Sequence, residues 1–103
     1  MNKEIKTNMA IKAEEILSFL DNPDHVILPE DRLTLEKVSY LAQTIVLNFD
    51  AASEDEVKQI NSLLSIVEKY FSYDDKDMKA FCIESLMREI NDIENDINKK
   101  YYI

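Results

Sequence analysis

Glycine is absent from this chain of 103 residues. Phosphate-cradling loops and nucleophile elbows need glycine, because a side chain would block the tight turn and the close approach of the backbone to a ligand. The absence therefore excludes the common nucleotide-binding and α/β-hydrolase motifs. We expect no enzymatic activity from this sequence.

Cysteine and histidine occur once each, as Cys82 and His25. One cysteine cannot form an internal disulfide, and its place among apolar residues predicts a buried, unreactive thiol. His25 lies beside Asp24 in a predicted loop, either as an exposed residue or as a pH-sensitive or partner contact. No Glu-x-x-His pair is present for a di-metal centre, and the acids from Asp74 to Asp77 depart from the calcium-loop pattern. We expect no catalytic residue, no metal site and no cofactor.

Long apolar runs are missing as well. No run approaches the ~20 residues that span a bilayer. The segment MNKEIKTNMAIKAEE carries charges where a signal peptide needs a continuous apolar core. These features predict a cytoplasmic protein without a membrane partner.

Positive charge is scarce, since 12 lysines and arginines face 21 aspartates and glutamates for a net charge of −9. Nucleic-acid binding relies on basic side chains that displace counterions from phosphates, so direct binding to nucleic acid is not expected. A cationic protein is the better electrostatic match. The alternative is that the acidity only keeps the protein soluble.

The residues that are present favour helices. Apolar residues recur every three or four positions in four segments, which places them on one face of each helix. The sequence predicts an all-α protein, a single domain over residues 1–103, folded as an antiparallel four-helix bundle with helices at about 3–20, 30–49, 54–72 and 75–98.

Polar residues mark the starts of the last two helices. Ser53 and Glu56 have the spacing of a capping box, and Asp74 is the expected N-cap of the fourth helix. Glu89 lies at the edge of the apolar face of that helix, where partial burial is one possibility and solvent exposure the other. The expected core residues of the fourth helix are Met78, Phe81, Cys82, Leu86, Ile90, Ile93 and Ile97.

Short connections between antiparallel helices place the first loop and the last turn at the same end of the bundle. This end is the candidate partner-binding surface. Carboxylates beside aromatic rings suit arginine and lysine, through charge-assisted hydrogen bonds and cation–π contacts. Helix capping alone is the competing explanation for the acids. The candidate partner-binding residues are Asp21, Asp24, Tyr70, Tyr73, Asp74, Asp75 and Asp77.

A second candidate surface lies on the second helix. Leu33, Tyr40 and Leu47 are seven residues apart and are therefore nearly aligned, away from the main core face. Either they pack against neighbouring helices, or they form an exposed patch for dimerisation or for another partner.

Residues 39–94 resemble a known family of proteins. Ile66-Val67-Glu68 closes one helix, an acidic turn follows, and Cys82-Ile83-Glu84-Ser85-Leu86 lies inside the next helix. These features resemble the small acidic all-helical immunity proteins that accompany bacterial polymorphic and contact-dependent-inhibition toxins. The resemblance implies a cytoplasmic, stoichiometric inhibitor, monomeric or homodimeric, that binds and neutralises a cognate basic toxin domain, often a nuclease.

A different class of protein also fits the sequence. A phage or mobile-element regulator could dimerise through Leu33, Tyr40 and Leu47 and bind a host protein, with its acidic surface acting as a mimic of DNA.

Overall fold

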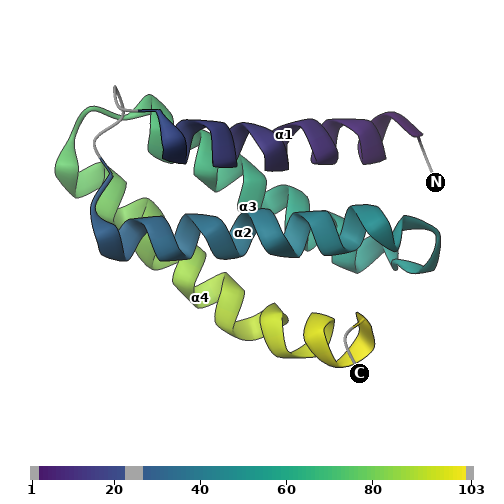
Figure 1. The fold of residues 1–103 in the computed structure, drawn as a ribbon. Coiled ribbons are helices and arrows are strands. Elements are labelled where there is room, and N and C mark those ends of the chain that lie inside the picture. The colour runs from purple at the N-terminus through teal and green to yellow at the C-terminus, as the bar shows by residue number, and fades with distance from the viewer. Residues whose placement is uncertain (1–2, 23–26, 102–103) are drawn as a thin grey trace.

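The computed structural model describes residues 3–22 and 27–101. These residues form four long helices, α1 (Lys3–Asp21), α2 (Pro29–Leu47), α3 (Glu54–Ser72) and α4 (Lys76–Tyr101), with a short 3-10 helix, η1 (Phe49–Ala51), between α2 and α3. Successive helices run in opposite directions and pack as a bundle (Figure 1). The predicted all-α, four-helix architecture is confirmed. None of the described helices is long and apolar enough to cross a membrane.

The start of α3 follows the prediction. The Ser53 hydroxyl accepts the backbone N–H of Glu56 at 3.1 Å, and the Glu56 carboxylate accepts the backbone N–H of Ser53 at 2.8 Å. This reciprocal capping box satisfies two backbone donors that would otherwise lack a helical partner. It fixes the first turn of α3 at Glu54.

The helices do not form a ring in chain order. α2 contacts each of the other three helices, whereas α1 and α4 make little contact with each other. In Figure 1, α1 and α4 lie on opposite sides of the molecule. As a result α2 and α4, which both begin at the same end of the bundle, are direct neighbours.

The core of α4 differs from the prediction at its first two turns. Met78 is 41% exposed and Phe81 is 64% exposed, while Ile83 is buried at 8% exposure. Helical geometry explains the difference, because Phe81 lies about 140° around the helix from the fully buried Leu86, and Ile83 only about 60°. The contact with α2 turns Ile83 inward and leaves Met78 and Phe81 at the surface.

The last turn of α4 is held against the start of α3, at the end of the molecule opposite to the α3–α4 turn. Oε1 of Glu56 accepts hydrogen bonds from Nζ of Lys100 at 2.8 Å and from the hydroxyl of Tyr101 at 3.2 Å. The same carboxylate therefore serves both the capping box and the docking of α4.

Candidate partner-binding site

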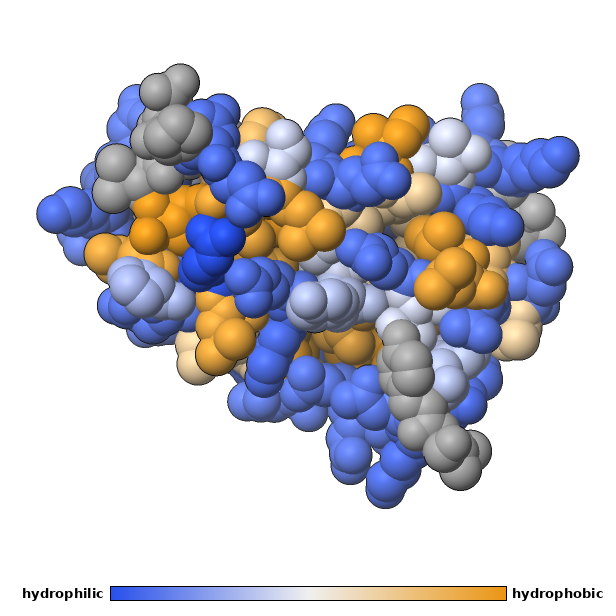
Figure 2. Space-filling view, in the orientation of Figure 1, coloured by the Kyte–Doolittle hydropathy of each residue, from blue (hydrophilic) through white to orange (hydrophobic). Residues whose placement is uncertain are grey.

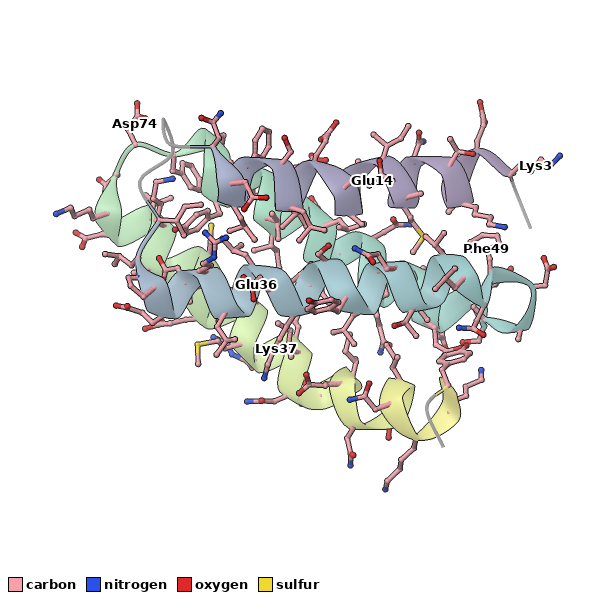
Figure 3. All side chains as sticks on the ribbon, in the orientation of Figure 1. Lys3, Glu14, Glu36, Lys37, Phe49 and Asp74 are labelled. Atoms are coloured by element: carbon pink, nitrogen blue, oxygen red, sulfur yellow. The ribbon has the colours of Figure 1, made fainter. Side chains whose placement is uncertain are left out.

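Four of the predicted acidic residues lie at one end of the bundle. Asp21 ends α1, and Asp74, Asp75 and Asp77 lie at the turn into α4, which Figure 3 marks with the label on Asp74. All four are exposed. We call this group, together with Asp31 at the start of α2, the acidic end. The fifth predicted acidic residue, Asp24, lies outside the described residues, as does His25.

Asp75, and not Asp74, caps α4. Oδ1 of Asp75 accepts the backbone N–H of Asp77 at 2.7 Å and that of Met78 at 3.4 Å, and its carbonyl accepts the N–H of Lys79. The prediction of Asp74 as the N-cap is wrong by one residue. Capping therefore explains Asp75, but the side chains of Asp74 and Asp77 have no hydrogen bond or ion pair within residues 3–22 and 27–101.

Helix dipoles favour Asp31 and Asp77, which lie in the first turns of α2 and α4, but not Asp21 at the end of α1. α2 and α4 begin there, whereas α1 and α3 finish there. The two partial positive charges of the helix starts are offset by two partial negative charges of the helix ends. The side chains, and not the backbone, therefore set the sign of the potential at this end.

Tyr70 is buried, with only 1% of its surface exposed, so its ring is hardly available for the predicted contact with a partner. Its hydroxyl donates a hydrogen bond to Oδ2 of Asp31 at 2.9 Å. Nζ of Lys79 donates to its carbonyl at 2.6 Å and lies 4.4 Å from its ring centroid. Burial first, and then the bond to Asp31, raise the pKa of Tyr70. Tyr70 thus joins α3 to both α2 and α4.

The sequence carried a signal for this burial. Leu63, Val67 and Tyr70 have the i, i+4, i+7 spacing of a core face, and all three are buried. Tyr73, at the end of α3, is half-buried and packs against the core, so part of its ring stays at the surface. Of the two predicted tyrosines, Tyr73 alone has a ring that can contribute to a contact surface.

A cleft of about 540 Å³ lies between the start of α2 and the first turns of α4. We call it the α2–α4 cleft. Its apolar lining residues are Leu28, Ala80, Ile83 and Tyr70, of which Leu28 and Ala80 are exposed. Four carboxylates and two ammonium groups surround this lining, so the balance of charge is negative. The lining residues are Leu28, Glu30, Asp31, Tyr70, Asp74, Lys76, Lys79, Ala80, Ile83 and Glu84.

Several residues of this end were not among the predicted site residues. Leu28 is 55% exposed in the cleft, and Phe81 and Met78 are exposed one turn apart on α4. Phe81 is an exposed aromatic ring four residues after Asp77 on the same helix, so an aromatic side chain does lie near an acid at this end. An apolar residue beside a helix start gives no sign in the sequence of whether it will be covered, so Leu28 could not have been identified from its spacing.

The outer face of α2 is exposed. Leu33, Tyr40 and Leu47 have exposed fractions of 60%, 63% and 81%, so they do not pack inside the bundle. Figure 2 shows apolar surface along this side of the molecule that is interrupted by charged and polar side chains. Lys37 extends from α2 (Figure 3), and its Nζ lies 3.7 Å from Oε1 of Glu94 on α4. The three residues form a row, which we call the α2 outer face, and not a wide continuous patch.

Two further side chains with reactive groups, Cys82 and Glu89, are at least partly buried. Cys82 is 4% exposed, and burial raises the pKa of its thiol despite the nearby Lys69 and Lys79. Glu89 is half-buried, accepts a weak hydrogen bond from Ser62 at 3.4 Å, and keeps one buried oxygen without a partner in the described part of the chain. No group of three or more potential metal ligands occurs among the described residues.

Comparison of the chain with protein families, with curated proteins and with solved structures finds no match. The geometry and charge of the bundle are therefore the basis for a functional proposal.

Proposed function

We propose that this chain is an immunity protein, a non-enzymatic bacterial inhibitor that works in the cytoplasm and binds one cognate basic toxin domain in a stoichiometric complex. The observation that carries the proposal is the α2–α4 cleft at the acidic end. There an apolar lining is surrounded by four carboxylates, and Asp74 and Asp77 have side chains that are not used to hold the described fold together.

Such a surface suits a protein that competes with a phosphate backbone. A nuclease toxin presents a basic cleft to its substrate. Carboxylates on the inhibitor attract that cleft and speed the encounter, while apolar side chains buried on contact slow dissociation. Asp74 and Asp77 would supply the attraction, and Leu28, Tyr73 and Phe81 the buried contacts.

Growth rescue tests the proposal directly. Cells that express the C-terminal domain of the protein encoded immediately upstream, as the candidate toxin, should grow only when this chain is co-expressed. The two purified proteins should then elute as one complex. Unrescued growth together with separate elution would rule out an immunity role toward that domain.

A second candidate function is a dimeric regulatory protein of a phage or mobile element that binds a host protein. The exposure of Leu33, Tyr40 and Leu47 favours it, since a row of large apolar side chains is a surface that a second helix can cover. Light scattering distinguishes the two candidates in part. A dimer that Leu47→Asp dissociates would support the regulator, with Asn95→Asp on an exposed position of α4 as the control. A monomer at all concentrations would exclude this dimer.

A further inference from the structure

We infer that the α2–α4 cleft receives an apolar side chain of the partner protein that is flanked by lysine or arginine, so that its natural occupant is a cationic amphipathic segment. This inference rests on the proposed function and names the chemistry of the partner at the same site. Both the apolar lining of the cleft and the charged residues around that lining, its rim, indicate this occupant.

The cleft is held open before any partner arrives. The Tyr70 ring that forms part of its wall is fixed from both sides, by Asp31 on α2 and by Lys79 on α4. Ile83 is buried in the core on its other side. A site that needs no rearrangement loses less conformational entropy on binding, which favours affinity.

The lining selects an apolar group. Leu28 is 55% exposed although it lies in a concave surface, so a partner side chain placed there would remove apolar area of Leu28 from water. Ala80 adds a small exposed residue to the lining, which leaves room above the first turns of α4. The volume of about 540 Å³ exceeds the need of one side chain, so flanking residues of the partner also enter.

The rim selects basic flanks. Glu30, Asp74 and Glu84 are exposed carboxylates around the lining, and Asp31 is a fourth, half-buried one. Covering them with a purely apolar partner would remove their hydration without replacement, which is costly. Lys79 already bonds to the Tyr70 carbonyl, so Lys76 is the one lysine of the lining without a hydrogen bond or ion pair among the described residues. Arginine or lysine on both sides of the inserted group meets these demands.

A defined peptide probes this inference without the toxin. The full-length protein is titrated by calorimetry with a synthetic helical peptide of leucine and arginine, capped at both ends. Control peptides carry glutamate in place of arginine or serine in place of leucine. We expect binding of the leucine and arginine peptide, and a loss of about tenfold or more in affinity for each control peptide.

Variants locate the binding site. Leu28→Ser removes apolar lining, and Ala80→Phe fills the cleft, both at exposed positions that leave the core intact. Each should weaken binding of the peptide by about tenfold. The matched controls are Leu47→Ser, on the α2 outer face, and Asn95→Phe, near the end of α4, and they should leave the affinity unchanged. Circular dichroism checks that all four variants are folded.

The outcomes separate the inference from the proposed function. Equal weakening by the cleft and control variants, or no binding of the peptide, would overturn the inference. Peptide binding at the cleft together with failed growth rescue would leave the inference standing and reject the immunity role. If Ala80→Phe rescues growth at the wild-type level, the cleft is not the toxin-binding site, but the immunity role stands.

Discussion

Tyr70 does three structural tasks at the acidic end. Its ring fills part of the core, its hydroxyl holds Asp31 on α2, and its carbonyl accepts Nζ of Lys79 on α4. Because α3 ends two residues later at Ser72, the bond from Lys79 also satisfies one of the last carbonyls of that helix. A single residue thus fixes the relative position of the elements that line the α2–α4 cleft.

Replacing the hydroxyl of Tyr70 should therefore cost stability. Tyr70→Phe keeps the ring and leaves the half-buried carboxylate of Asp31 without this donor, so we expect the free energy of unfolding to fall by about 1–2 kcal/mol in urea denaturation. Tyr40→Phe, at a position 63% exposed, is the control and should have little effect. Equal stability of both variants would contradict the role of the bond to Asp31.

The pH dependence of Tyr70 follows from the same contacts. Its pKa is raised in the folded protein, so its contribution to stability is complete below the ordinary tyrosine pKa of 10.0 and is lost as the pH rises toward the folded pKa. In urea denaturation Tyr70→Phe should therefore lose less stability than the wild type once the pH rises above about 10.

Protonation of Glu56, at the opposite end of the molecule, should lower the stability of the protein in acid. Partial burial alone would raise its pKa, but the hydrogen bonds from Lys100, Ser53 and Tyr101 together lower the pKa below its ordinary value. A carboxyl with a lowered pKa adds stability above its ordinary pKa, and that stability is lost as the pH falls through the folded pKa. The urea midpoint of Glu56→Gln should be lower than that of the wild type at pH 7, and the gap should close toward about pH 3.

The control for this prediction is Glu54→Gln, because Glu54 is an exposed acid in the first turn of the same helix. A gap between Glu56→Gln and the wild type that persists at acid pH would mean that the charge of Glu56 is not what holds α4 against α3.

At the scale of helices, the side chain of Asp75 caps the start of α4. Asp75 accepts two backbone N–H groups, those of Asp77 and Met78. We expect Asp75→Ala to lower the free energy of unfolding by about 1 kcal/mol, and Asp75→Asn to retain most of the stability, since asparagine also caps helices well. Thermal unfolding measures both. Asp74→Ala is the neighbouring control, and a loss as large as that of Asp75→Ala would reassign the cap.

The sequence predicted the helices better than their contacts. Periodic apolar residues and the Ser53–Glu56 capping box were sufficient to locate α3 at Glu54–Ser72. Asp74 and Asp75 are equivalent by residue type, and only the backbone path decides which one caps α4. Exposure of Phe81 and burial of Ile83 depend on the contact between α2 and α4. No local pattern contains that contact, and the α2–α4 cleft could not be predicted for the same reason.

For the molecule as a whole, the net charge of −9 is spread over the chain, yet its effect differs between the two ends. At the end opposite to the acidic end, Glu56 is neutralised by Lys100, while Asp50, Glu54 and Asp55 stay exposed. At the acidic end Asp74 and Asp77 lack such partners within the part of the chain that the structure describes, and Arg32 pairs with Asp21 and Glu36. We propose that a cationic protein docks at the acidic end, where exposed carboxylates surround the apolar lining of the α2–α4 cleft.

The association rate with an inactivated toxin domain, measured by stopped flow over a range of salt concentrations, tests this claim most directly. Asp74→Asn, Asp75→Asn and Asp77→Asn combined remove three charges and keep a capping residue. The matched control combines Asp50→Asn, Asp55→Asn and Asp96→Asn at exposed positions toward the opposite end. We predict that the first variant associates more slowly and with a weaker dependence on salt, while the control behaves as the wild type. Equal slowing of both variants, or of neither, would contradict the account.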